Sequence, residues 1–173
     1  IASHRVLQLG LTAASNLAHR GAVSADGQTA DGAGILTQLP RKLLCRELRL
    51  AGFAIDEADV AVGMIFFPRS HAPARERGLA IVEEEVRRSG LIQLMWRDVP
   101  VDRAALGEQA RATEPSSRQL LMKRPPGLSD DDFERALYVC RRRIQKRVAQ
   151  AGCDPFYLCS FSSRTVVYKG LVA

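Results

Sequence analysis

The sequence has few cysteines, few aromatic residues and no long apolar run, and these shortages exclude several classes of protein. The four cysteines form no C-x-x-C pair and have no histidine partners at zinc-finger spacing, which excludes a zinc ribbon and a disulfide-dense miniature. The longest apolar stretch, residues 60–67, is far shorter than the ~20 residues that span a bilayer, so we expect no membrane span. The first residues show no charged region leading into an apolar one, although a signal already removed leaves the same picture.

What is present is the composition of an ordinary globular domain. The chain has 173 residues, of which 46% are apolar and 25% charged, and its formal net charge is +6 at pH 7. A chain of this length corresponds to one domain and buries roughly 70% of the surface that its unfolded form exposes. The unpaired cysteines indicate reduced thiols, so we expect a cytoplasmic protein without a bound metal.

The positions of two cysteines predict structural roles, and a third is considered as a nucleophile. Cys140 falls on the apolar stripe of a predicted helix and Cys159 on an apolar strand face, so both are interpreted as small buried hydrophobic residues. Cys45 lies in a short predicted helix with no histidine nearby in sequence. A nucleophile there would need a base supplied entirely by the fold.

Periodicity and capping residues predict a mixed sequence of helices and strands. Predicted helices cover residues 3–18, 40–52, 73–89, 102–112 and 129–148. Predicted strands cover residues 35–39, 59–67, 91–96, 117–123, 156–161 and 165–171. Residues 19–34 are rich in glycine and aspartate and are predicted to form a long loop, a type of segment that is often functional.

Several of these elements carry more specific expectations. The helix from Ser3 is expected to bury one face, and the run Glu83-Glu84-Glu85 is expected to point largely outward. The last two strands are expected to form a hairpin around residues 162–164. Alternating helices and strands favour a parallel α/β sheet, whereas a closing hairpin does not, so periodicity leaves a doubly wound sheet and a layered α+β fold both open.

Five collinear blocks give the chain a resemblance to a known family. They are residues 19–36, 62–68 (Val-Gly-Met-Ile-Phe-Phe-Pro), 96–101 (Trp-Arg-Asp-Val-Pro-Val), 137–144 (Leu-Tyr-Val-Cys-Arg-Arg-Arg-Ile) and 156–170, which contains Ser-Phe-Ser-Ser-Arg-Thr-Val-Val-Tyr-Lys-Gly. In order and rough spacing they resemble the class II glutamine amidotransferase domain that opens the large chain of glutamate synthases. The resemblance covers nearly the whole sequence.

This resemblance implies both a fold and a mechanism. The implied fold is of the α+β class, a four-layer αββα sandwich of the N-terminal-nucleophile hydrolase type with antiparallel sheets. In that family an N-terminal cysteine attacks the side-chain amide of glutamine, and its own α-amino group acts as the base. Here position one is Ile1, and Asn16 is the one asparagine, so the family's Asn-Gly oxyanion hole is absent as well.

We therefore expect residues 1–173 to be a single partial domain, the middle portion of an amidotransferase domain that is incomplete at both ends. No catalytic residue is expected within them, and by themselves they are expected to be inactive. Arg20 and Gly21 are the candidate site residues, because they match the Arg-Gly pair that lies beside the nucleophile in the family. Arg164 is not taken as the arginine that grips the substrate, because the family's residue lies in a later motif.

For a full-length protein the resemblance implies glutamate synthase activity, with glutamine as the substrate. Ammonia released from glutamine would react with 2-oxoglutarate to form glutamate. FMN and an iron-sulfur cluster are implied for the full-length enzyme, but no cofactor is expected in this segment, which has no cluster-binding cysteine pattern and no phosphate loop. The implied partners are the remaining domains and a small electron-donating subunit, while the electron donor and the oligomeric state stay open.

Two alternatives remain at this point. The first is a noncatalytic relative that keeps the amidotransferase scaffold and whose native chain is this short. The second is a basic module that binds nucleic acid through residues Arg141, Arg142, Arg143, Lys146 and Arg147. Against the second, the cations are spread around a helix and have no aromatic residues among them, so we expect no nucleic-acid partner.

Overall fold

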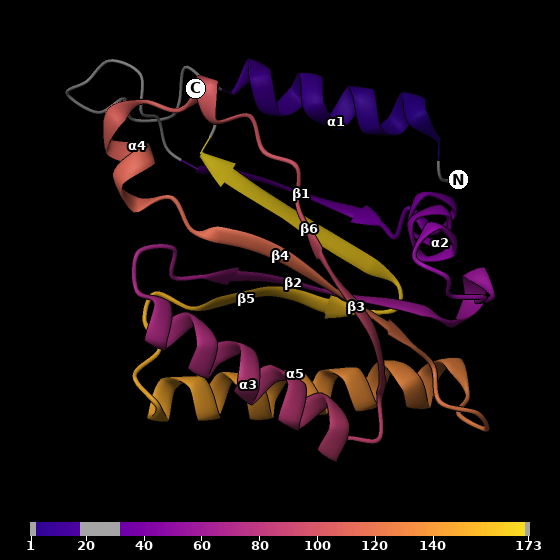
Figure 1. Cartoon of the computed structure of the whole chain (residues 1–173). Helices are drawn as coiled ribbons and strands as arrows, with labels where there is room; N and C mark the ends of the chain where they lie inside the picture. Colours follow the sequence, from indigo (N-terminus) through magenta and orange to yellow (C-terminus); the bar gives the residue numbers. More distant parts are fainter. Residues whose placement is uncertain (1–2, 18–31, 172–173) are drawn as a thin grey trace. The chain divides into compact units, whose positions relative to one another are not determined.

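The computed structural model describes residues 3–17 and 32–171 (Figure 1). The helices are α1 (His4–Asn16), α2 (Arg41–Leu50), α3 (Ala72–Arg88), α4 (Glu108–Thr113) and α5 (Asp130–Gln150), with short 3-10 helices η2 (Glu57–Asp59) and η3 (Arg103–Ala105). The strands are β1 (Gly32–Gln38), β2 (Val60–Phe67), β3 (Ile92–Asp98), β4 (Ser116–Lys123), β5 (Tyr157–Ser162) and β6 (Thr165–Leu171). The chain divides into two compact units. The larger comprises residues 39–99 and 115–166, and the described parts of the smaller are residues 3–17, 32–38, 100–114 and 167–171.

An antiparallel sheet forms the centre of the larger unit. Its strand order is β3-β4-β2-β5, and every neighbouring pair is antiparallel. Strand β2 lies inside the sheet, and all of its residues except Phe66 are buried, which explains its nearly continuous apolar sequence. The antiparallel pairing excludes the doubly wound parallel sheet that periodicity had left open. The α+β class implied by the resemblance is confirmed.

Helices α3 and α5 cover one face of this sheet, where they run side by side (Figure 1). Ser129 caps α5 by accepting a hydrogen bond from the backbone N–H of Asp132 at 3.2 Å. The predicted apolar stripe of α5 is confirmed, because each of its members is buried against the sheet: Phe133, Leu137, Cys140, Ile144 and Val148. Gly90 follows the end of α3 at a φ of 69°, a conformation that favours glycine.

Gly63 allows Phe161 to lie directly over strand β2. The two residues are paired across β2 and β5, and a Cβ atom added at Gly63 would lie 2.6 Å from two ring carbons of Phe161. We expect Gly63→Ala to destabilise this unit by about 2 kcal/mol, because the ring is held in a packed core. The measurement is the urea midpoint from pulse proteolysis of the native polypeptide. Gly170→Ala is the matched control, since a Cβ there meets nothing within 4 Å.

The predicted hairpin between residues 156–161 and 165–171 is wrong. Both strands form, but β5 pairs with β2 in the four-stranded sheet, whereas β6 pairs with β1 in a separate two-stranded sheet. Residues 162–164 therefore connect strands that belong to different sheets rather than forming a hairpin turn, and we name this connection the corner. The hydrogen bonds that hold this corner are described with the candidate site.

The predicted helix over residues 102–112 is also wrong in its extent. Asp102 does act as a cap, accepting a hydrogen bond from the N–H of Ala104 at 2.9 Å, but the helix it starts is only the short η3. The backbone is extended at Leu106 and Gly107, and α4 begins afresh at Glu108. A glycine that serves as the N-cap of the second helix separates the two segments.

Glu85 does not point outward as its neighbour Glu83 does. Its residue exposure is only 2%, because it lies between α3 and α5, where its Oε1 accepts a hydrogen bond from Arg147 Nη1 at 2.8 Å. A buried carboxylate is tolerated where a cation balances it. The sequence pattern did not reveal this burial, because the partner, Arg147, lies 62 residues further along the chain.

In the smaller unit, α1 begins at the predicted cap but does not bury its apolar face. Ser3 Oγ accepts a hydrogen bond from the N–H of Val6, while Leu7 and Leu11 stay 37% and 46% exposed. The helix packs against β1, where Gly10 approaches Ile35. A sheet of two strands is too narrow to cover such a face.

Candidate functional site

A carboxylate on α5 organises the corner between β5 and β6. Glu134 Oε1 accepts a hydrogen bond from Ser162 Oγ at 2.5 Å. Its Oε2 accepts from the backbone N–H and the hydroxyl of Ser163, at 2.8 and 2.6 Å. Both serines are buried. Because both oxygens of the carboxylate are already engaged, Glu134 is a structural anchor and not a free general base.

The same corner ties three segments of the larger unit together. Ser162 Oγ accepts hydrogen bonds from the backbone N–H groups of Arg164 and Thr165, at 2.9 and 3.3 Å. Arg41 at the start of α2 donates from Nη2 to the carbonyl of Ser163 at 2.6 Å, and the N–H of Leu39 donates to the carbonyl of Arg164 at 3.1 Å. The corner thus joins α5, the end of β5 and the chain entering α2.

Arg164 itself turns away from this network. Its side chain is 55% exposed and forms an ion pair with Asp131, on the first turn of α5. In the sequence Ser-Ser-Arg-Thr, the two serines therefore point inward and donate to Glu134. The arginine points outward and pairs with Asp131.

A second polar group links α2 to strands β3 and β4. Gln119 is 1% exposed, and its Oε1 accepts a hydrogen bond from Arg97 Nη1 at 3.1 Å. The Nε of Arg97 lies 3.8 Å from Oε2 of Glu47. A buried amide with a charged donor fixes the register of two strands, because a one-residue slip would leave both groups unpaired.

The four cysteines are free thiols in buried positions, as predicted for Cys140 and Cys159. Burial raises the pKa of Cys45, and the neighbouring carboxylate of Glu57 raises it further. Burial also raises the pKa of Cys140 to about 11. A thiol that stays protonated at neutral pH is a poor nucleophile, which favours structural roles for Cys45 and Cys140.

This environment predicts how the thiols respond to alkylation. In the folded protein at pH 8, iodoacetamide should leave Cys140 unmodified, because the reactive thiolate forms only as the pH approaches the raised pKa of about 11. In urea at the same pH, the cysteine returns to an ordinary pKa and should react. Peptide mass analysis of both samples is the measurement. Equal labelling of Cys140 in the folded and unfolded samples would show that the thiol is accessible.

Arg20 and Gly21 lie outside the residues that the structure describes. The same holds for most of the predicted loop over residues 19–34, of which β1 takes the last three. Their placement beside a nucleophile stays a prediction.

The basic residues of α5 do not act as one group. Arg147 forms ion pairs with Glu84 and Glu85, at 2.7 and 2.8 Å, and thereby lowers the pKa of the Glu84 carboxyl. Arg141 donates to the carbonyls of Leu158 and Cys159. Two of the five cations that suggested a nucleic-acid surface therefore bind inside the unit, which weakens that alternative.

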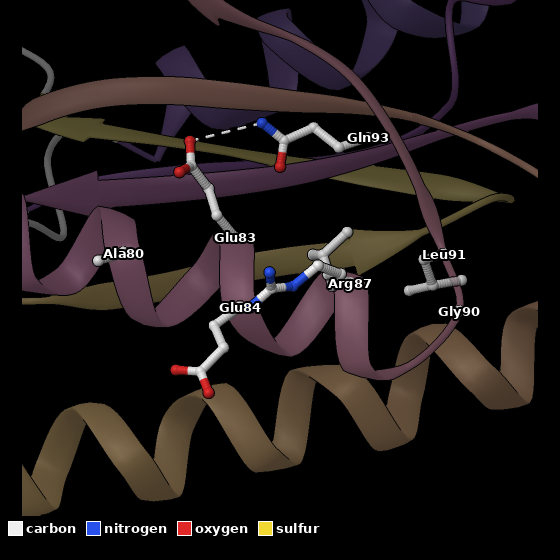
Figure 2. Close-up of a pocket in the computed structure, with 8 residues that line it drawn as sticks. Ala80, Glu83, Glu84, Arg87, Gly90, Leu91 and Gln93 are labelled. Carbon is white, nitrogen blue, oxygen red and sulfur yellow. Dashed lines mark hydrogen bonds between the residues drawn. The ribbon is translucent and has the colours of Figure 1, made fainter.

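A shallow hollow lies where α3 ends and β3 begins (Figure 2). Glu83, at its edge, accepts hydrogen bonds from Gln93 Nε2 at 3.4 Å and Trp96 Nε1 at 2.9 Å. Glu84, also part of the lining, pairs with Arg147. The hydrogen bonds of Glu83 join helix α3 to the edge strand β3. Within the described residues, no three histidine, cysteine, aspartate or glutamate side chains gather as metal ligands would.

Comparison with known families supplies the identification that the polar groups alone do not. The family described as glutamine amidotransferases class-II matches residues 1–173. The chain belongs to this family. Residues 162–164, which Glu134 holds, lie within residues 156–170, one of the blocks that resemble the amidotransferases.

Several curated relatives of this class II amidotransferase chain are glutamate synthases. It is 40% identical over 166 residues to the glutamate synthase [NADPH] large chain of Azospirillum brasilense, covering 96% of this chain and 11% of that protein. It is 41% identical over 170 residues to the ferredoxin-dependent glutamate synthase 2 of Synechocystis sp., covering 98% and 11%. With the glutamate synthase [NADPH] large chain of Bacillus subtilis it shares 35% identity over 174 residues, covering 98% and 11%. The amidotransferase chain thus spans about a tenth of the length of these relatives.

Sequence reasoning missed Glu134, the residue that holds the amidotransferase corner together. Its position beside Phe133, at the border of the apolar stripe, was a weak signal. The two consecutive serines at the end of an apolar strand were a stronger one, because buried hydroxyls need partners. Their partner comes from a helix 28 and 29 residues away, which no local pattern reveals.

Proposed function

We propose that residues 1–173 are part of the glutamine-hydrolysing domain of a glutamate synthase. The observation that carries this proposal is the match to glutamate synthases over 96% and 98% of the chain. In the proposed reaction, glutamine is hydrolysed to glutamate and ammonia, and the ammonia reacts with 2-oxoglutarate to form a second glutamate. Relatives named for NADPH and for ferredoxin both match, so the proposal leaves the electron donor open.

Within this reaction we assign a supporting role to the described residues. The cysteines are buried, and the carboxylate of Glu134 is engaged by hydrogen bonds. We propose that residues 1–173 are one partial domain, the middle portion of the amidotransferase domain. Residues outside this range then supply the nucleophilic cysteine and the oxyanion hole. Arg20 and Gly21 would then lie beside the nucleophile and hold it in place.

The described residues do not fit the iron-sulfur cluster that the resemblance implies, and the resemblance places FMN with that cluster. The four cysteines are dispersed in the core, and no group of metal-ligating side chains is present in residues 3–17 and 32–171. We therefore propose that both cofactors bind elsewhere in a longer polypeptide, together with the remaining domains and a small electron-donating subunit.

A cytoplasmic location is part of the same proposal. It is supported by four cysteines that are free thiols rather than disulfides. No helix in the described part of the chain combines the length and apolar character needed to cross a membrane.

The first test is an intact mass and N-terminal sequence of the native polypeptide, combined with a glutaminase assay. The proposal expects a mass far above 19.0 kDa, a cysteine at the mature N-terminus and release of glutamate from glutamine. Added 2-oxoglutarate and a reductant should increase the glutamate formed per glutamine consumed. A native chain that ends at these 173 residues and leaves glutamine intact would instead support the noncatalytic alternative.

The proposed role of Arg20 predicts the behaviour of a variant. In the native polypeptide, Arg20→Ala should reduce glutaminase turnover by about 100-fold, because a nucleophile displaced by even ~1 Å reacts that much more slowly. The matched control is Arg5→Ala, which removes an exposed arginine from α1. Steady-state kinetics at saturating glutamine is the measurement. Equal turnover in the two variants would assign Arg20 to the loop's conformation alone.

A further inference from the structure

The outward face of α5 differs from an ordinary solvated helix face. It presents two apolar side chains, Tyr138 at 60% exposure and Val139 at 39%, in the middle of the helix. The cations Arg142, Arg143 and Lys146 surround them, and all three are exposed. We name these five residues the α5 outer face.

The charges of this face are not balanced within the unit. Arg142 donates to the neutral amide of Gln145 at 3.4 Å. In the part of the chain that the structure describes, Arg143 and Lys146 form no ion pair. By contrast, Arg135 on the same helix forms an ion pair with Asp132 at 2.7 Å.

The composition and shape of the face are those of a protein interface. Tyrosine and arginine are enriched in such interfaces, and lysine and arginine at the rim steer acidic partners toward them. The face is not flat, because a hollow between α3 and α5 reaches Val139 and Arg143. A partner side chain entering there would anchor the contact.

We propose that the α5 outer face binds an acidic surface, with an apolar centre, in another part of the same polypeptide. This rests on the proposed function, in which this chain is one portion of a longer enzyme. The matched relatives leave about nine tenths of their length outside this region, so such a surface has ample chain to come from. Covalent linkage raises the effective concentration of the two surfaces to the millimolar range, so a small face suffices.

Two other occupants fit the face less well. A second copy docked through the same face would place the arginines and the lysine of the two copies next to each other. These like charges repel. A nucleic acid would find only three uncompensated cations around an apolar centre, because Arg141 and Arg147 are engaged inside the unit.

Lys146 provides a direct test, since it is the one lysine of α5. The acetylation rate of Lys146 in the native polypeptide is measured before and after nuclease treatment. Each rate is compared with the rate in urea. If the docked state is populated about ten to one over the undocked state, acetylation slows about tenfold, because only the undocked state exposes Lys146. Zero-length carbodiimide coupling should then join Lys146 to an aspartate or glutamate outside residues 1–173, and Lys146→Arg should abolish that link.

A charge-reversed variant and its control complete the experiment. Arg142→Glu with Arg143→Glu should abolish both the protection of Lys146 and the carbodiimide link. Arg46→Glu with Arg49→Glu, a matched pair on the exposed side of α2, should leave both unchanged.

Three results would overturn the proposal. They are an unprotected Lys146, a link to a second copy, and protection that disappears with nuclease. A polypeptide that hydrolyses glutamine but leaves Lys146 unprotected would refute the docking alone, whereas failure of the glutaminase assay would refute the proposed function.

Discussion

Residues 1–173 alone are expected to release no glutamate from glutamine above a heat-killed control. Class II chemistry needs an N-terminal cysteine, and these residues begin with Ile1. Loss of the nucleophile costs on the order of a millionfold in turnover, which removes any measurable rate. No internal thiol is placed as a substitute, because all four cysteines are buried, and burial raises the pKa of Cys45 and of Cys140.

The native polypeptide, assayed at the same concentration of sites, is the positive control for this prediction. A coupled assay for glutamate with glutamine as the only substrate is the measurement. Cys45→Ala serves as the second control, because it is the one cysteine whose position in a short helix invited a catalytic interpretation. Glutamate formed by residues 1–173 and lost in Cys45→Ala would contradict the prediction and make Cys45 the nucleophile.

Local patterns predicted the helices better than the pairing of the strands. The stripe from Phe133 to Val148 on α5 follows from the 3.6-residue period, which depends only on neighbours along the chain. The hairpin failed because proximity in sequence favoured β5 beside β6, while the actual partner of β6 is β1, more than 100 residues earlier. Strand pairing is decided by burial of whole faces, which no short window contains.

Polar groups with partners nearby in the sequence were also easier to predict than those with distant partners. Caps such as Ser129 and Asp102 were predictable, since their hydrogen-bond partners lie two or three residues ahead. Glu85 and Glu134 were not, because their partners come from other elements. The family resemblance supplied the α+β class and the basis for the proposed function, but it did not reveal which carboxylates are buried.

Glu134→Ala is expected to lower the stability of the larger unit by about 3 kcal/mol. The substitution removes three hydrogen bonds to a carboxylate and leaves Ser162 and Ser163 buried without an acceptor. The loss should extend to the corner as a whole, because Ser162 also orients the backbone of Arg164 and Thr165. The urea midpoint from pulse proteolysis of the native polypeptide measures the effect.

Glu134→Gln tests why a carboxylate is needed rather than any polar group. The Glu134 oxygens receive three donors, and the hydroxyl of Ser162 already accepts from two backbone N–H groups, so an amide NH₂ would face a donor or a filled acceptor in either orientation. We expect a loss of about 2 kcal/mol even for this near-isosteric change. Glu76→Gln, on the exposed side of α3, should change stability by less than about 0.5 kcal/mol. If Glu134→Gln behaved like Glu76→Gln, the corner would not depend on an anionic acceptor, and the buried serines would have to be satisfied by solvent.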